Sequence, residues 1–190
     1  IAKWIMKTPF FKSLFQILPS LGSMILLGHI IKYLEDNPNK IIVIDSPSSG
    51  HAMTMFESPQ NFREMFGSGM IVDDIKRMHQ FIYNNHLLKT IISCIPTQMA
   101  INEGKELEHY INKIGIENTQ IVINDSLTAF FQHNNKDPLT IPLFLQEKIN
   151  LEEKILRDVK KKNKIILPKF LETNSKTIIS QLTDKMESLI

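Results

Sequence analysis

Apolar residues follow two distinct patterns along this 190-residue chain. Uninterrupted runs of mostly β-branched residues, bounded by turn residues, are typical of strands buried on both faces of a parallel sheet. Apolar residues at helical spacing instead indicate amphipathic helices. The runs predict strands at 41–45, 89–95, 119–123 and 164–167. The helical spacing predicts helices at 59–66, 71–84, 98–114, 143–163 and 175–189.

The order of these elements predicts an α/β fold. Strands separated by long helical stretches need crossover connections, which give a mostly parallel sheet with helices on both faces. We expect the apolar stripe of the 71–84 helix to pack on this sheet and Gly115 to end the 98–114 helix. Segment 125–142 is expected to be loop-rich, with one turn near 127–131.

Residues 1–36, which precede the first predicted strand, contain a long stretch without charged residues. No Lys, Arg, Asp or Glu occurs from Ser13 to Ile31, which is long enough to raise the possibility of a membrane span. Pro19 and Gly22 interrupt this run, so we favour two buried or amphipathic helices hinged there. The chain then divides into a helical segment over 1–36 and an α/β region over 37–190.

Composition narrows the class of protein. With 43% hydrophobic residues the chain can bury a sizeable core, and a net charge of +2 provides no global field for nucleic acid. Its single cysteine excludes an internal disulfide and favours a reducing compartment, so a cytoplasmic location is expected, with peripheral membrane attachment as a variant. Cys94 lies inside a predicted strand and is interpreted as a small core residue.

Candidate chemistry begins at Asp45, which ends the first predicted strand. Open α/β sheets bind ligands and metal-bound phosphates at the carboxyl ends of their strands. The loop that follows contains Ser, Pro and Gly and runs to His51. An aspartate that only caps this turn is the simpler alternative.

Three segments of the chain resemble a known family. The segment from Asp45 to His51, followed by Glu57-Ser58-Pro59, resembles the D-T-A-P-T-G-H-T … P signature of the anion-transporting ATPases. That family includes arsenite-pump ATPases and the ATPases that target tail-anchored membrane proteins. Segment 91–103 resembles its V-x-x-P-E-x-M-x-x-x-E pattern, and 121–124 resembles its V-V-V-N strand. Departures from these patterns occur at Ser46, Ser48, Ala52 and Thr97.

The resemblance implies a phosphate-loop NTPase-like fold and hydrolysis of ATP with Mg²⁺ that drives a conformational switch. It implies that Asp45 binds Mg²⁺, that the Gly50 backbone approaches the γ-phosphate, and that His51 either anchors the loop or acts as a relay. A simple turn glycine is the alternative for Gly50.

The resemblance also implies a nucleotide-binding set further along the chain. Asn124 corresponds to the family's adenine-contacting Asn, and Pro168 to the proline of its adenine loop. Glu103 corresponds to a residue that meets the phosphate-loop lysine, although a solvent-facing helical glutamate is an equal alternative.

Two kinds of motif that the resemblance would predict are absent from these 190 residues. No G-x-x-x-x-G-K-[ST] motif occurs, and the chain begins with Ile1. We therefore expect the C-terminal part of an ATPase, inactive without its N-terminal phosphate-loop half. The C-x-x-C zinc pair of the targeting ATPases and the metalloid-binding cysteines of the arsenite ATPases are also absent.

A second class of function stays open. The chain would then be a non-catalytic binding module that holds an apolar helix, a membrane surface or a membrane-protein client. If the chain is an ATPase fragment, loss of the central phosphate-loop strand would leave unpaired edges. We then expect the chain either to rearrange its own strands or to associate with a second copy as a homodimer.

Overall fold

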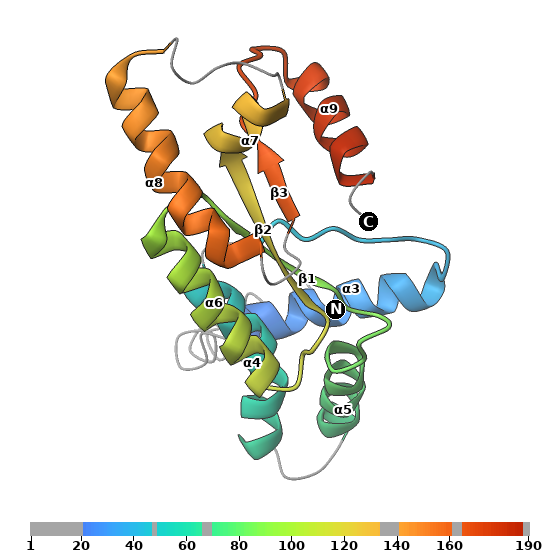
Figure 1. Ribbon diagram of the computed structural model, residues 1–190. Helices are drawn as coiled ribbons and strands as arrows, with labels where there is room; N and C mark the ends of the chain where they lie inside the picture. Colours follow the sequence, from blue (N-terminus) through green and yellow to red (C-terminus); the bar gives the residue numbers. More distant parts are fainter. Residues whose placement is uncertain (1–20, 47–48, 66–69, 134–140, 161–164, 188–190) are drawn as a thin grey trace, which may run out of the picture. The chain divides into compact units, whose positions relative to one another are not determined.

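The computed structural model describes residues 21–46, 49–65, 70–133, 141–160 and 165–187 (Figure 1). The chain divides into two compact units. The first comprises the residues up to Leu88 together with Ile114–Glu117, and the second comprises Lys89–Lys113 together with the residues from Asn118 onward.

The first unit is helical. It contains α3 (Leu21–Asp36), α4 (Ser49–Met65) and α5 (Met70–Ile82), which pack against one another. Each helix buries an apolar stripe against the other two helices. Its buried apolar residues are Met24, Leu27, Ile31, Phe56, Phe62, Val72, Ile75, Met78, Ile82 and Ile116. The second of the two predicted N-terminal helices is thus confirmed as α3, while the first lies outside the described residues.

The predicted strand at 41–45 is wrong. Residues 41–46 form no helix or strand, and the side chains of Ile41 and Val43 are 91% and 90% exposed. A run of β-branched residues favours the extended backbone, but a buried strand also needs neighbours that accept its hydrogen bonds and cover its faces. The three-stranded sheet that the described residues form does not include this segment.

The predicted loop through His51 and the helix start at Pro59 are also wrong. Gly50 and His51 lie within α4, which begins at Ser49 and contains Pro59. Proline lacks the N–H of a helical hydrogen bond, so it usually marks a helix start. Here Ser58 donates its hydroxyl to the Thr54 carbonyl, and both Ser58 and Pro59 are buried, so packing holds the helix through the proline.

The α5 helix confirms the predicted helix at 71–84 but not its packing. Ile75, Met78 and Ile82 are buried, and α5 packs against α3 and α4 rather than on the sheet as predicted. The spacing of apolar residues identifies the buried face of a helix without identifying what covers it.

The second unit is α/β, as predicted. Its elements are β1 (Thr90–Cys94), α6 (Gln98–Lys113), β2 (Thr119–Ser126), α7 (Leu127–His133), α8 (Leu143–Lys160), β3 (Ile165–Pro168) and α9 (Ser175–Glu187). The three strands pair in parallel in the order β1-β2-β3, which makes a small open sheet. The later three strand predictions and the helices predicted at 98–114, 143–163 and 175–189 are confirmed within the described residues, with ends shifted by a few residues. The loop predicted from residue 125 is wrong over 127–133, which form α7.

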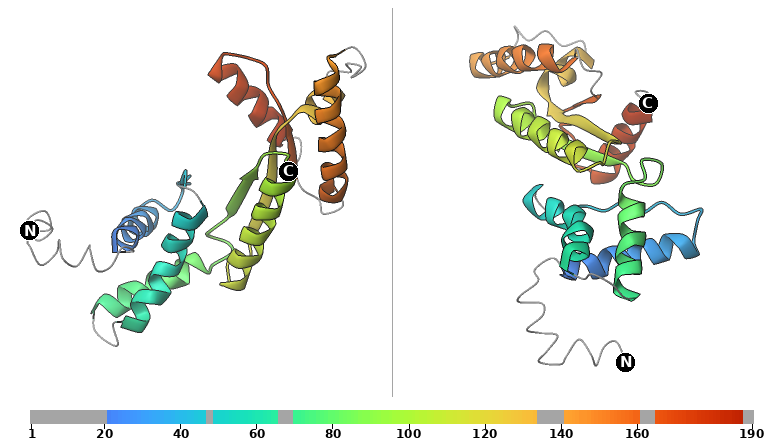
Figure 2. Two further views of the ribbon diagram at one scale, coloured as in Figure 1. Left: turned by 90° about the vertical axis from the view of Figure 1, so that its left-hand side faces the viewer. Right: turned by 90° about the horizontal axis from the view of Figure 1, so that it is seen from below.

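Helices cover both faces of this sheet (Figure 2). On one face, α9 packs through Leu182 and Met186 on a cluster of Val122, Ile165 and Leu167. On the opposite face lie α6 and α8, and α6 contacts β1 and β2. Ile121 and Ile123 are fully buried, as expected for the central strand of a covered sheet.

Gly115, which follows α6, and Cys94, which lies on β1, have the structural roles predicted for them. Gly115 follows the helix with φ of +97°, the left-handed conformation that glycine adopts at helix C-termini. Cys94 is a buried free thiol, and the close approach of α6 to β1 at Gly104 brings the helix backbone against its sulfur. Among the described helices, none is both long and apolar enough to cross a bilayer.

Candidate functional site: the carboxyl edge of the sheet

The carboxyl ends of β2 and β3 lie side by side. Ser126 at the end of β2 pairs with Pro168 at the end of β3. Asn124, two residues before Ser126, is therefore at the same edge as Pro168, and its side chain is half-buried. Two of the predicted nucleotide-binding residues thus lie near the carboxyl ends of neighbouring strands, at the edge where open α/β sheets bind ligands.

A β-bulge shapes the end of β2. Between the pairs Ile123↔Ile166 and Ser126↔Pro168, β2 advances by three residues while β3 advances by two. The extra residue falls at Asn124 or Asp125, and Asp125 has φ of +63°, in the left-handed region. A bulge bends its strand and re-aims the side chains beside it, and bulges are frequent next to functional sites.

Lys169 ties the bulge to the neighbouring strand. Its Nζ lies 3.0 Å from both carboxylate oxygens of Asp125, and its backbone N–H donates to the Ser126 carbonyl at 2.8 Å. The Lys169 and Asp125 side chains are 35% and 50% exposed, so this ion pair is open to solvent.

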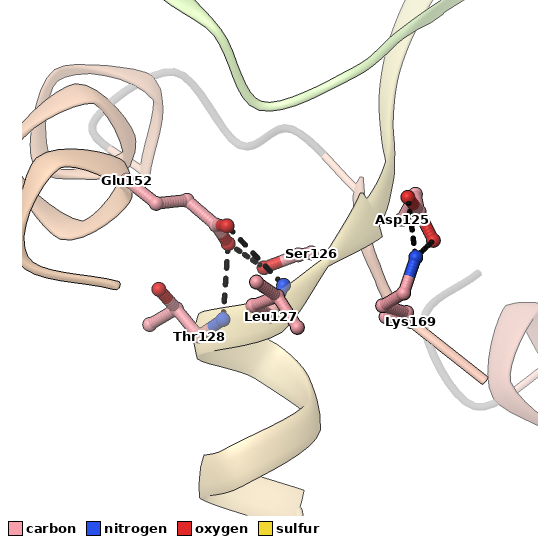
Figure 3. A network of polar contacts seen from close by, with 6 residues as sticks. All are labelled: Asp125, Ser126, Leu127, Thr128, Glu152 and Lys169. Atoms are coloured by element: carbon pink, nitrogen blue, oxygen red, sulfur yellow. Dashed lines mark hydrogen bonds and ion pairs between the residues drawn. The ribbon is translucent and has the colours of Figure 1, made fainter. Parts of the chain in front are cut away.

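A buried carboxylate lies on the other side of the β2 end (Figure 3). Glu152, in the middle of α8, accepts hydrogen bonds from the Ser126 hydroxyl and from the backbone N–H groups of Leu127 and Thr128, the latter two at 3.2 and 3.0 Å. These N–H groups belong to the first turn of α7, which has no carbonyl partners within the helix. Glu152 therefore satisfies them and fixes α7 to α8.

Ser126 acts in this network as the N-cap of α7. Its Oγ accepts the Ala129 N–H at 3.0 Å while it donates to Glu152. A serine immediately before a helix is a recognisable N-cap signal, and Glu152 occupies the same α8 stripe as buried Ile149, Leu156 and Val159. A carboxylate on the apolar stripe of α8 is therefore a signal that the sequence itself carries.

The other predicted site residues are not on β2 or β3. Glu103 belongs to the same unit, on the exposed side of α6. Asp45 belongs to the first unit, in the exposed segment 41–46, and Gly50 and His51 belong to α4 of that unit. Asn124 and Pro168 thus lie near one sheet edge, and the polar contacts at the end of β2 involve Asp125, Ser126, Glu152 and Lys169, which were not predicted.

Metal-binding capacity in the described part of the chain is limited. No three His, Cys, Asp or Glu side chains there gather closely enough to hold an ion among themselves. Asp45 offers one exposed carboxylate.

Comparison with known proteins adds no family to this description: neither a family model nor a curated protein matches the chain.

Proposed function

We propose that this chain is the C-terminal part of an ATPase that couples Mg-ATP hydrolysis to a conformational switch, and that its carboxyl sheet edge binds the nucleobase. The observation that carries the proposal is the juxtaposition of Asn124 and Pro168 on neighbouring parallel strands. Although 44 positions apart in the chain, both residues lie at the sheet edge where this class of fold binds ligands.

The chemistry of the Asn124 side chain suits a base. An Asn side chain presents a donor and an acceptor side by side, as does the edge of adenine. Pro168 is buried at the end of β3, where its fixed φ shapes the backbone of this edge. Ser126 and Glu152, which fix the start of α7 at the end of β2, satisfy each other and have a structural role.

The metal and phosphate part of the proposed site requires other residues. For this part the proposal rests on the sequence resemblance alone, which assigns Asp45 to Mg²⁺, Gly50 and His51 to phosphate sensing and Glu103 to a phosphate-loop lysine. A phosphate loop from outside these 190 residues supplies that lysine and the backbone N–H groups that bind phosphate. By themselves the 190 residues are then expected to bind Mg-ATP negligibly.

The test separates binding from chemistry in the protein encoded by the complete gene. Asn124→Ala is expected to weaken nucleotide binding, because it removes the base contact. Asp45→Asn is expected to abolish most hydrolysis while binding stays measurable, because the carboxylate orders the metal. Glu147→Gln, an exposed change on α8, serves as the control. Near-normal turnover in Asp45→Asn would contradict the assignment.

A binding module for apolar partners is the second candidate, and the exposed segment 41–46 favours it. Ile41 and Val43 present apolar, β-branched side chains to solvent, a pattern that suits strand addition with a partner chain. This candidate predicts client or membrane binding that ATP does not change. The ATPase proposal instead predicts that the nucleotide state changes the binding of a client or membrane.

A further inference from the structure

The end of β2 holds a non-glycine residue in a left-handed conformation. Asp125 has φ of +63°, which L-residues adopt infrequently, although Asp tolerates it better than most. Such outliers persist where the surrounding structure enforces them, and they concentrate at functional sites. The preceding residue is Asn124, the proposed base contact.

The surroundings of Asp125 enforce this conformation from two directions. Lys169 holds its carboxylate through both oxygens at 3.0 Å and holds the next residue through the 2.8 Å hydrogen bond to the Ser126 carbonyl. Ser126 in turn is fully buried and bonded to Glu152. On the other side of the bulge, Ile123 is fully buried in the sheet. The two bulge residues are thus held between fixed neighbours.

An exposed ion pair of this kind contributes little to folding stability. The Asp125–Lys169 ion pair instead restricts the backbone next to Asn124, from which the Asn124 side chain extends. The orientation of an amide decides which base edge it can pair with. Adenine presents an amino donor where guanine presents the O6 acceptor, so a fixed amide distinguishes the two bases and a loosely held one does not.

We infer that the Asp125–Lys169 ion pair is a positioning device, which holds the β2 bulge so that the Asn124 amide reads adenine rather than guanine. The inference rests on the proposed function. Neither residue takes part in phosphate chemistry, so the pair sets the selectivity for ATP over GTP and not the rate of hydrolysis.

The test compares ATP with GTP in the protein from the complete gene. Asp125→Asn removes the charge and keeps a side chain that tolerates the left-handed conformation, and Lys169→Met keeps an unbranched side chain of similar length. For both variants we expect the ratio of GTP to ATP dissociation constants to fall about tenfold, the value of one well-placed base contact. The turnover number at saturating ATP is expected to change less than about twofold.

Two further variants separate positioning from general damage. Lys169→Arg keeps the ion pair and is expected to retain the wild-type ratio. Asp36→Asn removes the exposed Lys32–Asp36 pair of α3, at 3.4 Å, and is the matched control for loss of a surface carboxylate. It is expected to leave the ratio unchanged.

Each possible result either supports or overturns the positioning role. An unchanged GTP-to-ATP ratio in Asp125→Asn, with Asn124→Ala still weakening ATP binding, overturns the positioning role and leaves the proposed function standing. If Asn124→Ala also binds ATP as the wild type does, the proposed function fails with it. If Lys169→Met does not fold, Asp125→Asn and Lys169→Arg give the answer.

Discussion

The Ser126 hydroxyl donates to the Glu152 carboxylate, and both residues are buried although 26 positions separate them in the chain. This contact joins the end of β2 to the middle of α8. Because the same carboxylate accepts the Leu127 and Thr128 N–H groups, one side chain fixes the position of α7 as well.

Replacement of Glu152 by Gln is expected to destabilise the α/β unit by about 1–3 kcal/mol, because the new amide NH₂ group would face donors and leave buried N–H groups unsatisfied. Urea unfolding measures the change. Glu147→Gln, on the exposed side of the same helix, is the control and is expected to stay within about 0.5 kcal/mol of wild type. Equal stability of the two variants would show that the network is not structural.

Gly104→Ala tests the close packing of α6 on β1. A Cβ at this position would overlap the Cys94 sulfur, so the helix must shift or the thiol must move. We expect a loss of about 1–3 kcal/mol, the usual cost of overpacking, even though Ala is the better helix former. Thermal unfolding measures it, with exposed Glu106→Ala as the control on the same helix. A more stable Gly104→Ala protein would contradict the packing described.

The helical unit is expected to lose stability in mild acid through His79. Burial, and then the positive charge of Arg63, lower the pKa of His79 below its ordinary value of 6.5, and its ring lies 4.1 Å from that of Tyr83. A histidine with a lowered folded pKa contributes stability that is fully present above pH 6.5 and is lost as the pH falls through the folded pKa.

Melting curves of the wild type and His79→Gln at several pH values test this expectation. The melting temperature of the variant is expected to fall less steeply below pH 6.5 than that of the wild type. His109→Gln, an exposed histidine of α6, is the control and is expected to keep the wild-type slope. Identical slopes for wild type and His79→Gln would rule out the contribution.

The exposed segment at Ile41–Ile44 is expected to promote association of two copies. Extended apolar residues without strand partners are templates for pairing with another chain. Sedimentation of the 190-residue chain is expected to show a dimer that Val43→Lys weakens. Leu143→Lys changes an exposed apolar residue of α8 and is expected to leave the mass unchanged. A strictly monomeric wild type would contradict this prediction.

The sequence predicted the elements whose formation depends on local patterns. The β1-α6-β2 order followed from two apolar runs and a capped helix between them, and the left-handed Gly115 followed from its place after that helix. Ile41–Ile44 failed as a strand because β-branched residues favour an extended backbone but cannot supply a neighbouring strand.

The candidate site was only half predictable for the same reason. Asn124 and Pro168 could be named from resemblance, yet their proximity depends on the pairing of β2 with β3. The bulge, the left-handed Asp125 and its contact with Lys169 arise from that pairing and leave no local pattern. Glu152 was the exception, since a carboxylate on the buried stripe of α8 can be recognised from spacing alone.

The most direct test of the central claim is a calorimetric titration of Mg-ATP into the protein from the complete gene and into its Asn124→Ala variant. We predict wild-type binding in the range of about 1 μM to 1 mM, typical of enzyme substrates, and binding at least about tenfold weaker in the variant. Equal affinity of the two proteins, or no binding to the wild type, would contradict the claim that the carboxyl edge at Asn124 and Pro168 holds the nucleobase.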